Sequence, residues 1–546
     1  MIQYNASFFS LTLCAPIATY INADLGPKPY YVWIQIVWPL AFAATITIDG
    51  RLGDLFGRRW LMIGGNILCV VASIIGGTAQ SIGVVILATG LNGTAAAIQQ
   101  TSSAAVGEIV PRKYRPQAAS AVAGSGIIGG AFGTPIAIHV ATKLSWRWGF
   151  WITLLTAGIS VVGLICLYFP PTFEEVHSKD RRTKWQEFKD FDFIGVTLFI
   201  GGITVLLLGI SWGGVTYPWK SAGVIVPLII GALALVAFGF WEVFGNLNES
   251  LVPYKLFQNV RGFTMVLVAE FVGGMLLYAM ISIYPVQIAT VYESNPAVAA
   301  WEDCTLLMGT FVGVLLMGSI LGRIGHARLI FVGSVGLNTI FIGCMAAMTP
   351  STLGAALALT TLTGLTIGFL QLVGIVMIML NCPDEDIGVA VGLNGSARSI
   401  GGSIATAMYS TILTNKVQEV LPGKIAAAVL PLGLPKSSLG PLIVALLSGS
   451  TAAIERVPGV TLPVIGAAAQ AVKESYAQGF RLVYLVAIPF GVVATVCAAC
   501  ARDIDHLLTN DVAAKLHSPE LQPRHRNTVN NSNADVEAPS QVVEKA

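Results

Sequence analysis

Fourteen apolar stretches recur along the chain, and each is long enough to cross a lipid bilayer as a helix. A membrane span needs about 20 mostly apolar residues, because the hydrocarbon core is about 30 Å thick and a helix rises about 1.5 Å per residue. The predicted spans are residues 4–22, 30–48, 60–79, 82–106, 117–141, 147–169, 192–212, 222–244, 262–287, 303–321, 329–348, 352–380, 389–413 and 480–500. Only 11% of the residues are charged, against about 25% in soluble domains. The sequence therefore predicts an all-α polytopic membrane protein.

Basic residues are distributed unevenly between the two sets of predicted loops. The loops after the even-numbered spans and the C-terminal tail hold 20 lysines and arginines, whereas the short loops of the opposite face hold four. Lysine and arginine favour cytosolic loops, so both termini are predicted to be cytosolic. The first apolar run lacks the basic start and the cleavage site of a signal peptide, so we expect it to be retained as a span.

A glycine-rich polar stretch separates the second and third predicted spans and reads Asp49-Gly50-Arg51-Leu52-Gly53-Asp54-Leu55-Phe56-Gly57-Arg58-Arg59. It predicts a tight polar loop, because glycines permit sharp turning and close backbone approach. Asp54 is expected to cap the free amides at the start of the next helix. A second stretch, residues 322–328, looks like a degraded copy that keeps the glycines and basic residues but lacks the aspartate.

The first stretch resembles the loop signature between the second and third helices of major facilitator superfamily transporters. The matching residues are Gly50, Leu52, Asp54, Gly57, Arg58 and Arg59, whereas Leu55 replaces the usual first basic residue. The fourteen-span layout, the long outer loop before the last span, and residues 64–66, 107–111 and 146–150 resemble the fungal trichothecene efflux pump group. The resemblance implies the major facilitator superfamily fold, with two six-helix bundles and an inserted helix pair. It also implies a conformational, gating role for Gly50, Asp54, Gly57, Arg58 and Arg59.

This organisation divides the chain into five parts. They are an N-terminal six-helix bundle (1–169), a charged cytosolic linker (170–191), the inserted helix pair (192–261), a C-terminal six-helix bundle (262–502) and a disordered cytosolic tail (503–546). Within the second bundle, residues 414–479 alternate apolar pieces with prolines and glycines. We expect them to form short helices that lie at the outer membrane surface.

Two charged residues stand deep within predicted spans. Glu270 is eight residues into the ninth span, about 12 Å deep, and Arg398 is ten residues past Gly388 in the thirteenth span, about 15 Å deep. A charge at such a depth is costly without a partner and usually faces a cavity or an opposite charge. The similar depths allow an ion pair, or a protonatable glutamate that a nearby arginine tunes. One interpretation is proton coupling or substrate binding; the other is a permanent salt bridge that fixes helix packing.

Further polar and small residues lie within predicted spans. The amides of Gln99, Gln100, Asn338 and Gln371 are candidates for the transport cavity or for hydrogen bonds between helices. Gly126, Gly130, Gly133 and Pro135 give the spacing of close helix packing and predict a bend. This second set also resembles the Gly/Pro motif in the fifth helix of superfamily antiporters, which favours export, although plain helix packing is the alternative.

The sequence gives no sign of an enzyme, since it holds no activated nucleophile, phosphate loop or metal-ligand set. No basic tract points to nucleic acid, and the eight scattered cysteines form no disulfide framework. The resemblance implies a proton-coupled secondary transporter that works by alternating access, without a cofactor. Such a monomer would export small amphipathic molecules (a mycotoxin, a secondary metabolite or a drug) across a fungal plasma membrane, with the vacuolar membrane as the other location. The alternative function is proton-coupled uptake of siderophore iron.

Overall fold

The computed structural model describes residues 1–170, 189, 191–214, 216–245, 250–293, 295–447 and 456–508. Nearly all of the predicted charged linker (170–191) and of the predicted disordered tail (503–546) lie outside the described residues. The described residues form helices joined by short turns, which confirms the all-α prediction. Thirteen helical segments among them are long and apolar enough to cross a membrane. The protein is therefore a multi-pass membrane protein.

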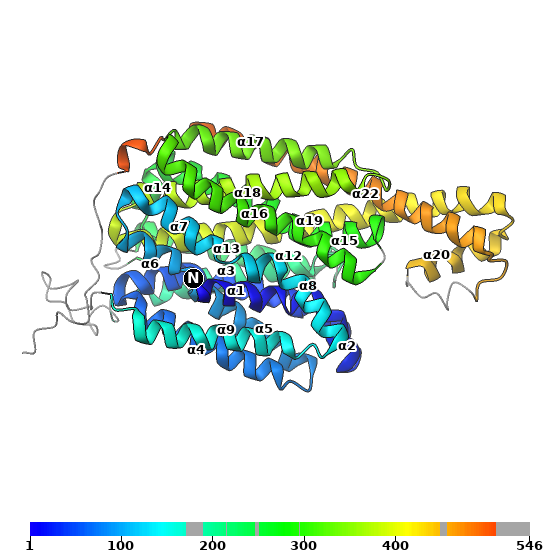
Figure 1. Ribbon diagram of the computed structural model, residues 1–546, viewed down its shortest axis with the longest axis horizontal. Coiled ribbons are helices and arrows are strands. Elements are labelled where there is room, and N and C mark those ends of the chain that lie inside the picture. The colour runs from blue at the N-terminus through cyan, green and yellow to red at the C-terminus, as the bar shows by residue number, and fades with distance from the viewer. Residues whose placement is uncertain are drawn as a thin grey trace, which may run out of the picture.

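The helices fall into two lobes and an added pair (Figure 1). The first lobe holds α1 (Ile2–Thr12), α2 (Ala18–Asp24), α3 (Trp33–Phe56), α4 (Arg58–Gly77), α5 (Ile82–Gln100), α6 (Ser102–Ile109), α7 (Arg115–Gly124), α8 (Ile127–Lys143) and α9 (Trp148–Leu167). The second lobe holds α14 (Lys255–Gln258), α15 (Met265–Gln287), α16 (Pro296–Ile324), α17 (Ala327–Met345), α18 (Leu353–Asn381), α19 (Ile387–Val429), α20 (Leu439–Leu447) and α22 (Leu462–Cys500). The pair consists of α12 (Phe193–Trp212) and α13 (Ala222–Phe244).

The lobes have separate apolar cores and meet along two seams. One core packs Leu13, Val85 and Phe150 within the first lobe. A larger core, which includes Phe331 and Tyr484, belongs almost wholly to the second lobe. The seams are formed by α3 against α19 and by α7 and α8 against α16. Two cores joined by narrow seams suit a molecule whose halves move as units.

The inserted pair packs beside the first seam. Helix α12 lies against α13, α3 and α19, and Phe199, Ile203 and Leu207 of α12 share an apolar cluster with Ala43 and Ile48 of α3. Helix α13 exposes much of its apolar surface, as expected of a helix that faces lipid. The inserted pair therefore contacts the seam of α3 and α19 through α12, while α13 lies on the outer side of α12.

Helix α19 occupies the position of the thirteenth predicted span but is less apolar than the other spans. One of its polar residues forms hydrogen bonds with α3. The Ser396 hydroxyl lies 2.7 Å from the Thr47 hydroxyl and 2.7 Å from the Ala43 carbonyl. Helix α19 lies between α3, α15 and α22. It therefore completes the layout of fourteen spans, although hydropathy and length alone identify thirteen.

The expectation of short surface helices over residues 414–479 is largely wrong. Helix α19 continues without a break to Val429 and α22 begins at Leu462, so most of this segment extends two long helices beyond the bundle (Figure 1). Buried residues recur every fourth position along this part of α19, which gives one apolar stripe; they are Leu413, Val417, Leu421, Ile425 and Val429. The stripe packs against α22 and outweighs Pro422, which stands inside the helix. Among the described residues of this segment, α20 and two 3-10 turns (Leu430–Leu432 and Lys436–Ser438) are the short pieces that agree with the expectation.

The predicted loop at residues 49–59 is also shorter than expected. Helix α3 continues to Phe56 and α4 begins at Arg58, so Gly57 alone joins them, with φ of 87°. This left-handed conformation favours glycine, which has no Cβ to clash. Asp54 therefore lies in the last turn of α3 and does not cap the next helix in the chain.

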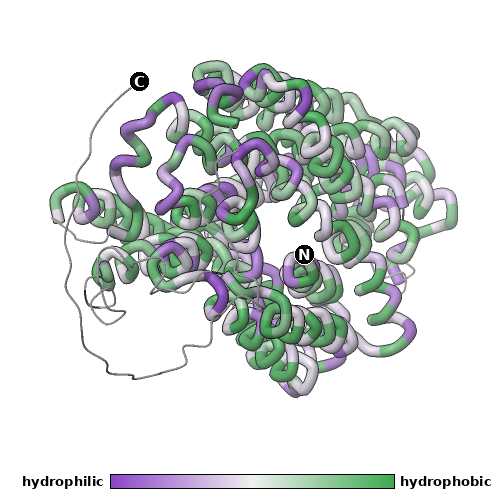
Figure 2. Tube along the Cα trace, turned by 60° about the vertical axis from the view of Figure 1, so that its left-hand side comes forward, coloured by the Kyte–Doolittle hydropathy of each residue, from purple (hydrophilic) through white to green (hydrophobic). Residues whose placement is uncertain are grey.

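The two ends of the molecule differ in charge and shape. We call the end that carries the α3–α4 turn and the starts of α15 and α19 the basic end. The end from which α19 and α22 project is the hairpin end. Figure 2 shows hydrophobic residues over most of the helix bodies and hydrophilic stretches mainly at helix ends and turns.

Candidate functional site

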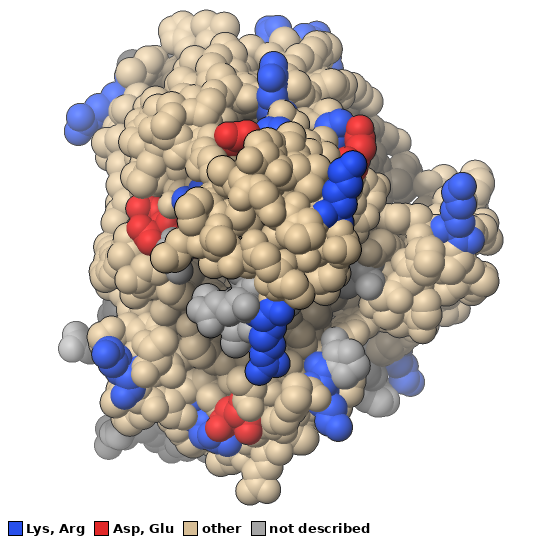
Figure 3. Space-filling model, turned by 90° about the vertical axis from the view of Figure 1, so that its right-hand side faces the viewer, with Lys and Arg blue, Asp and Glu red and all other residues tan. Residues whose placement is uncertain are grey.

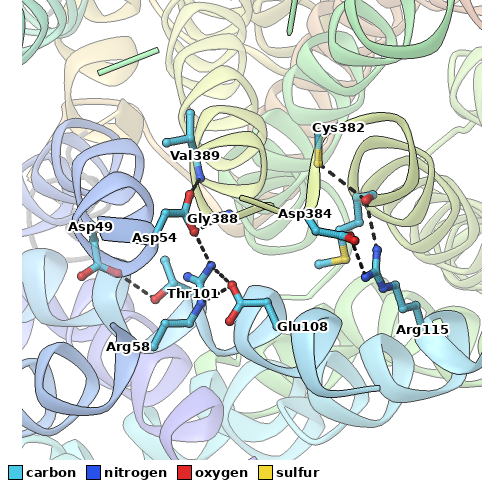
Figure 4. A network of polar contacts seen from close by, with 11 residues as sticks. Asp49, Asp54, Arg58, Thr101, Glu108, Arg115, Cys382, Asp384, Gly388 and Val389 are labelled. Carbon is cyan, nitrogen blue, oxygen red and sulfur yellow. Dashed lines mark hydrogen bonds and ion pairs between the residues drawn. The ribbon is translucent and has the colours of Figure 1, made fainter. Parts of the chain in front are cut away.

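Asp54 joins the two lobes at the basic end. Its Oδ1 accepts a hydrogen bond from the Gly388 amide (3.0 Å) and its Oδ2 accepts one from the Val389 amide (2.8 Å). Both amides belong to the first turn of α19, where they have no partner within the helix and where the helix dipole is positive. A carboxylate satisfies both requirements. Asp54 thus caps a helix of the opposite lobe, as Figure 4 shows.

Arg58 and Glu108 hold Asp54 in place. The Arg58 Nη2 lies 2.6 Å from Asp54 Oδ1, and its Nε donates to Glu108 Oε1 at 2.7 Å. Arg58 is buried, so its charge is balanced by two carboxylates rather than by water. Burial raises the pKa of the neighbouring Tyr168 to about 12, and the Glu108 carboxylate adds to the rise, so this phenol stays neutral. We call Asp54, Arg58, Glu108, Gly388 and Val389 the Asp54 cluster.

Three more arginines of the first lobe meet acidic residues that precede α19. Arg51 pairs with Asp386 (Nη1 to Oδ1, 3.2 Å). Arg112 and Arg115 both pair with Asp384, at 2.8 Å and 3.1 Å. All these pairs cross from one lobe to the other at the same end. Figure 4 shows the pair of Arg115 and Asp384 near the Asp54 cluster. The basic end is therefore closed by a network of opposite charges.

Glycines let the two backbones approach beneath this network. A Cβ on Gly50 would overlap the carbonyl of Gly388, and a Cβ on Gly392 would overlap the backbone of Ile46 and Thr47. Close approach of this kind removes space for any path between α3 and α19. Arg59 is separate from this contact, since its Nη2 donates to the Ile165 carbonyl at 3.1 Å.

The hairpin end has the opposite character. Figure 3 shows a hollow between the upper and lower lobes on this face. Among the described residues, the hydrogen bonds between α3 and α19 run from Ala43 to Asp54, in the half of α3 nearest the basic end. In the outer half of α3, Trp38 donates to Ser10 of its own lobe, and Leu40 packs against the apolar cluster that Ile404 of α19 also contacts. The charge network thus joins the lobes at the basic end, whereas a hollow lies between them at the hairpin end.

Glu270 and Arg398 lie together between α15 and α19. Arg398 Nε is 3.6 Å from Glu270 Oε2, and the side chains are 18% and 0% exposed, respectively. Neither Glu270 oxygen has a hydrogen-bond partner within the described part of the chain. Gly374 of α18 makes room for the carboxylate, because a Cβ there would overlap Oε1. The structure brings together the two charges that sequence reasoning paired by depth.

Known proteins share this architecture. The sequence profile of the fungal trichothecene efflux pump family (TRI12) matches residues 1–544. The chain belongs to this family. Trichothecene efflux pump TRI12 of Fusarium sporotrichioides is 32% identical over 517 residues, which cover 94% of this chain and 86% of that protein. TRI12 of Trichoderma arundinaceum is 30% identical over 553 residues, with 97% and 90% covered.

A solved structure agrees on the fold. The proton:xylose symporter XylE, a major facilitator superfamily protein, matches with a TM-score of 0.52 at 11% identity, over 90% of this chain and 93% of XylE. At this identity the likeness shows the fold alone. The predicted major facilitator superfamily fold is therefore confirmed, and the relatives in the pump family are transporters rather than enzymes.

Within this pump fold, the four predicted amides separate into two kinds. Gln99 and Asn338 hold helices together: Gln99 donates to Asn66 (3.0 Å), and Asn338 donates to Thr366 and to the Thr363 carbonyl. Gln100 makes one long contact of 3.4 Å, to the Ser7 hydroxyl. Gln371 has an Nε2 atom that is buried without a partner among the described residues. Gln371 is therefore the amide that best fits a cavity role.

The glycine/proline set lies where α1, α8 and α16 meet. Its members are Gly126, Gly130, Gly133 and Pro135. The bend lies at Ser125 and Gly126, between α7 and α8, and not at Pro135, which stands inside α8. Gly126 and Gly130 leave room for the Phe311 ring of the opposite lobe, and Gly133 leaves room for Thr12. Close packing is thus what this set provides here.

Sequence reasoning missed the partners of the Asp54 cluster. Glu108 follows the fourth predicted span, where the sequence left a solvated and a gate-forming position open, and Asp384 and Asp386 were not predicted as partners. The available signal was the acidic run Asp384-Glu385-Asp386 just before a span, opposite a loop with three basic residues. Charge complementarity between two loops at the same membrane face could have suggested a contact.

Proposed function

We propose that the chain is a proton-coupled exporter of small amphipathic molecules in a fungal plasma membrane. Family membership supports export, since its relatives are named as trichothecene efflux pumps. Mycotoxins and other secondary metabolites are the substrate class that these names favour. The excess of basic residues supports a cytosolic basic end, which makes the present structure outward-facing.

Alternating access then requires the two ends to open in turn. In the outward-facing state, the charge network and the Gly50–Gly388 contact close the cytosolic side. The inward-facing state must break the bonds from Asp54 to α19 and reform contacts at the hairpin end. Gly50, Asp54, Gly57 and Arg58 act in this change, whereas Arg59 stabilises its own lobe.

The observation that carries proton coupling is the buried Glu270–Arg398 pair. An ionised carboxylate in a span is costly, and here it is balanced by one arginine at 3.6 Å without a direct hydrogen bond. A proton that enters from the outer hollow neutralises Glu270 and releases Arg398. Loss of that proton to the cytosol restores the pair. Each cycle thus links proton entry to a change in charge between α15 and α19.

The test is transport in sealed proteoliposomes of known orientation with an imposed pH gradient. We expect Glu270→Gln to abolish pH-driven transport while the protein still inserts and folds. Glu474→Gln is the matched control, because this carboxylate pairs with Lys424 on the exposed hairpin. Unchanged pH-driven transport in Glu270→Gln would remove Glu270 as the coupling site.

The same vesicles separate export from the alternative of siderophore uptake. The panel holds a trichothecene, an amphipathic cation and a ferric hydroxamate siderophore. Movement of the first two from the cytosolic face, against the proton gradient, supports the exporter. Inward movement of the siderophore alone would replace it by proton-coupled iron uptake.

A further inference from the structure

A pocket of about 500 Å³ opens at the basic end of the second lobe, away from the seam between the lobes. It lies where the segment before α15, the start of α17 and the end of α22 come together. The polar residues that line it are Gln258, Asn259, Arg261, Arg328, Arg502 and Asp503. Neither the Asp54 cluster nor the Glu270–Arg398 pair contributes to it, so transport as proposed above leaves the pocket unexplained.

Three arginines from three separate segments face this pocket, and backbone contacts fix their positions. Arg261 Nε donates to the Cys500 carbonyl at 3.1 Å. The Arg502 amide donates to the Arg261 carbonyl at 2.9 Å. Arg328 Nη2 donates to the Ala499 carbonyl. The three arginines are spread over more than 240 residues of sequence. The fold therefore brings their positive charges together at one site.

These arginines differ from the arginines of the charge network. Arg58, Arg112 and Arg115 are each paired with a carboxylate. Within the described ranges, no carboxylate forms an ion pair with any of the three pocket arginines. Asp503 also lines the pocket, but its Oδ1 accepts from the Ile504 amide at 2.8 Å, and among the described residues it forms no ion pair with these arginines. Guanidinium groups that are not ion-paired with carboxylates can bind phosphate, often through two parallel hydrogen bonds.

The surroundings of the pocket are those of a membrane surface. Arg261 stands at the start of the α15 span and Arg502 stands two residues after α22 ends. Next to the pocket, α22 exposes Val492, Val493 and Val496. An apolar helix face of this kind can hold acyl chains while the pocket holds the charged group.

We propose that this pocket binds the phosphate group of an anionic phospholipid. The three arginines bind the phosphate oxygens, the amides of Gln258 and Asn259 can donate to the rest of the head group, and the acyl chains lie along α22. A free phosphate ion shares the recognition chemistry, but only the lipid also uses the apolar face. The proposal concerns a binding site outside the transport path and holds for either direction of transport.

The test is native mass spectrometry of the purified full chain titrated with dioleoyl phosphatidic acid. Dioleoyl phosphatidylcholine is the comparison lipid, because it has the same tails without the net negative charge. Each arginine near a membrane surface contributes about fivefold to the affinity for an anionic lipid. We therefore expect the triple variant Arg261→Gln/Arg328→Gln/Arg502→Gln to bind phosphatidic acid about a hundredfold more weakly. Arg502→Gln alone should weaken binding about fivefold and leave the fold intact, because the contact between Arg502 and Arg261 is made by backbone atoms.

A matched variant removes three exposed basic residues of the same end that lie outside the pocket. It is Lys113→Gln/Lys255→Gln/Arg323→Gln, and it should bind phosphatidic acid as the unchanged protein does. Equal losses in the two triple variants would overturn the proposal in favour of a diffuse surface charge effect. If inorganic phosphate raises the melting temperature through these arginines while phosphatidic acid is not retained, the ligand is a free phosphate and the lipid assignment is wrong.

Discussion

The two glycine-and-arginine turns of the chain use the same chemistry for different purposes. In the first turn, Asp54 binds the amides of Gly388 and Val389 at the start of α19. The second turn lacks its own aspartate, and Asp505 supplies the carboxylate, accepting from the amides of His326 (2.5 Å) and Ala327 (3.3 Å). Each carboxylate caps the start of a helix. The first cap crosses between lobes, whereas the second stays within one lobe.

This difference assigns separate roles to two parts that look like copies. In the proposed cycle, a cap between lobes breaks whenever the basic end opens, so its strength would contribute to the balance between the two states. A cap within a lobe moves with that lobe and affects only its stability. The second turn lacks the aspartate of the first, which is consistent with a turn that has no role in the change between the two conformations.

The largest expected effect comes from filling the contact beneath the first turn. Gly50→Ala places a methyl group against the Gly388 carbonyl, which is backbone and cannot move aside. Overpacking of this kind costs about 1–3 kcal/mol. We expect the outward-facing state to be lost and the transport rate to fall about 30-fold or more. The measurement is the initial transport rate in proteoliposomes, per inserted molecule.

Gly322→Ala is the corresponding change in the second turn. Its methyl group meets the end of the Gln117 side chain, which is flexible and can rotate away. The transport rate should fall less than about threefold. Equal losses at Gly50 and Gly322 would show that both seams switch to the same extent.

The next largest effect is expected when the carboxylates of Asp54 and Asp505 are changed in turn. Asp54→Asn removes charge-assisted bonds worth about 1.5–3 kcal/mol, so we expect kcat to fall at least about tenfold with little change in KM. Asp505→Asn should leave kcat unchanged and lower the melting temperature, because a lost helix cap costs about 1 kcal/mol of stability. A change confined to KM in Asp54→Asn would contradict a role in switching.

The smallest effect is expected at the rim of the network. Asp384 is partly exposed, and its pairs with Arg112 and Arg115 are screened by solvent. Asp384→Asn should therefore reduce the transport rate only about two- to fivefold, because buried Arg115 keeps its bond to the Met379 carbonyl. The rate of labelling of a cysteine placed at the basic end would report the same shift. A loss as large as that of Asp54→Asn would make the rim, and not the capped helix, the main contact between the lobes.

Local rules predicted the helices well but not their partners. Apolar run length located the spans, because a span must bury its backbone polar groups in one continuous helix whatever its neighbours are. The charge–depth argument brought Glu270 and Arg398 together for a similar reason, since a deep charge requires a partner. The partner of Asp54 could not be predicted in this way, because it consists of two backbone amides 334 and 335 residues away, which carry no sequence signal.

Proline and glycine predicted the ends of helices less reliably than apolar run length predicted the spans. The prolines and glycines of residues 414–479 predicted broken helices, yet Pro422 stands inside a helix of 43 residues. The stripe of buried residues on α19 and the facing surface of α22 stabilise each other, and this tertiary packing exceeds the local cost of a proline. Pairing between two segments of one chain was not visible from either segment alone.

Helix α19 is one rod that contains both elements of the proposed mechanism and a distant tip. Gly388 lies at its start, Arg398 follows ten residues later, and Val429 ends it about 60 Å from Gly388 at 1.5 Å per residue. A tilt of about 10° around Arg398 would move the tip by about 8 Å, given about 46 Å of helix beyond that point. In the proposed cycle, the projecting hairpin would convert a small tilt of α19 into a larger displacement of its tip. A fluorescent probe on its tip would report, from the hairpin end, whether the Asp54 cluster at the opposite end of the molecule is formed or broken.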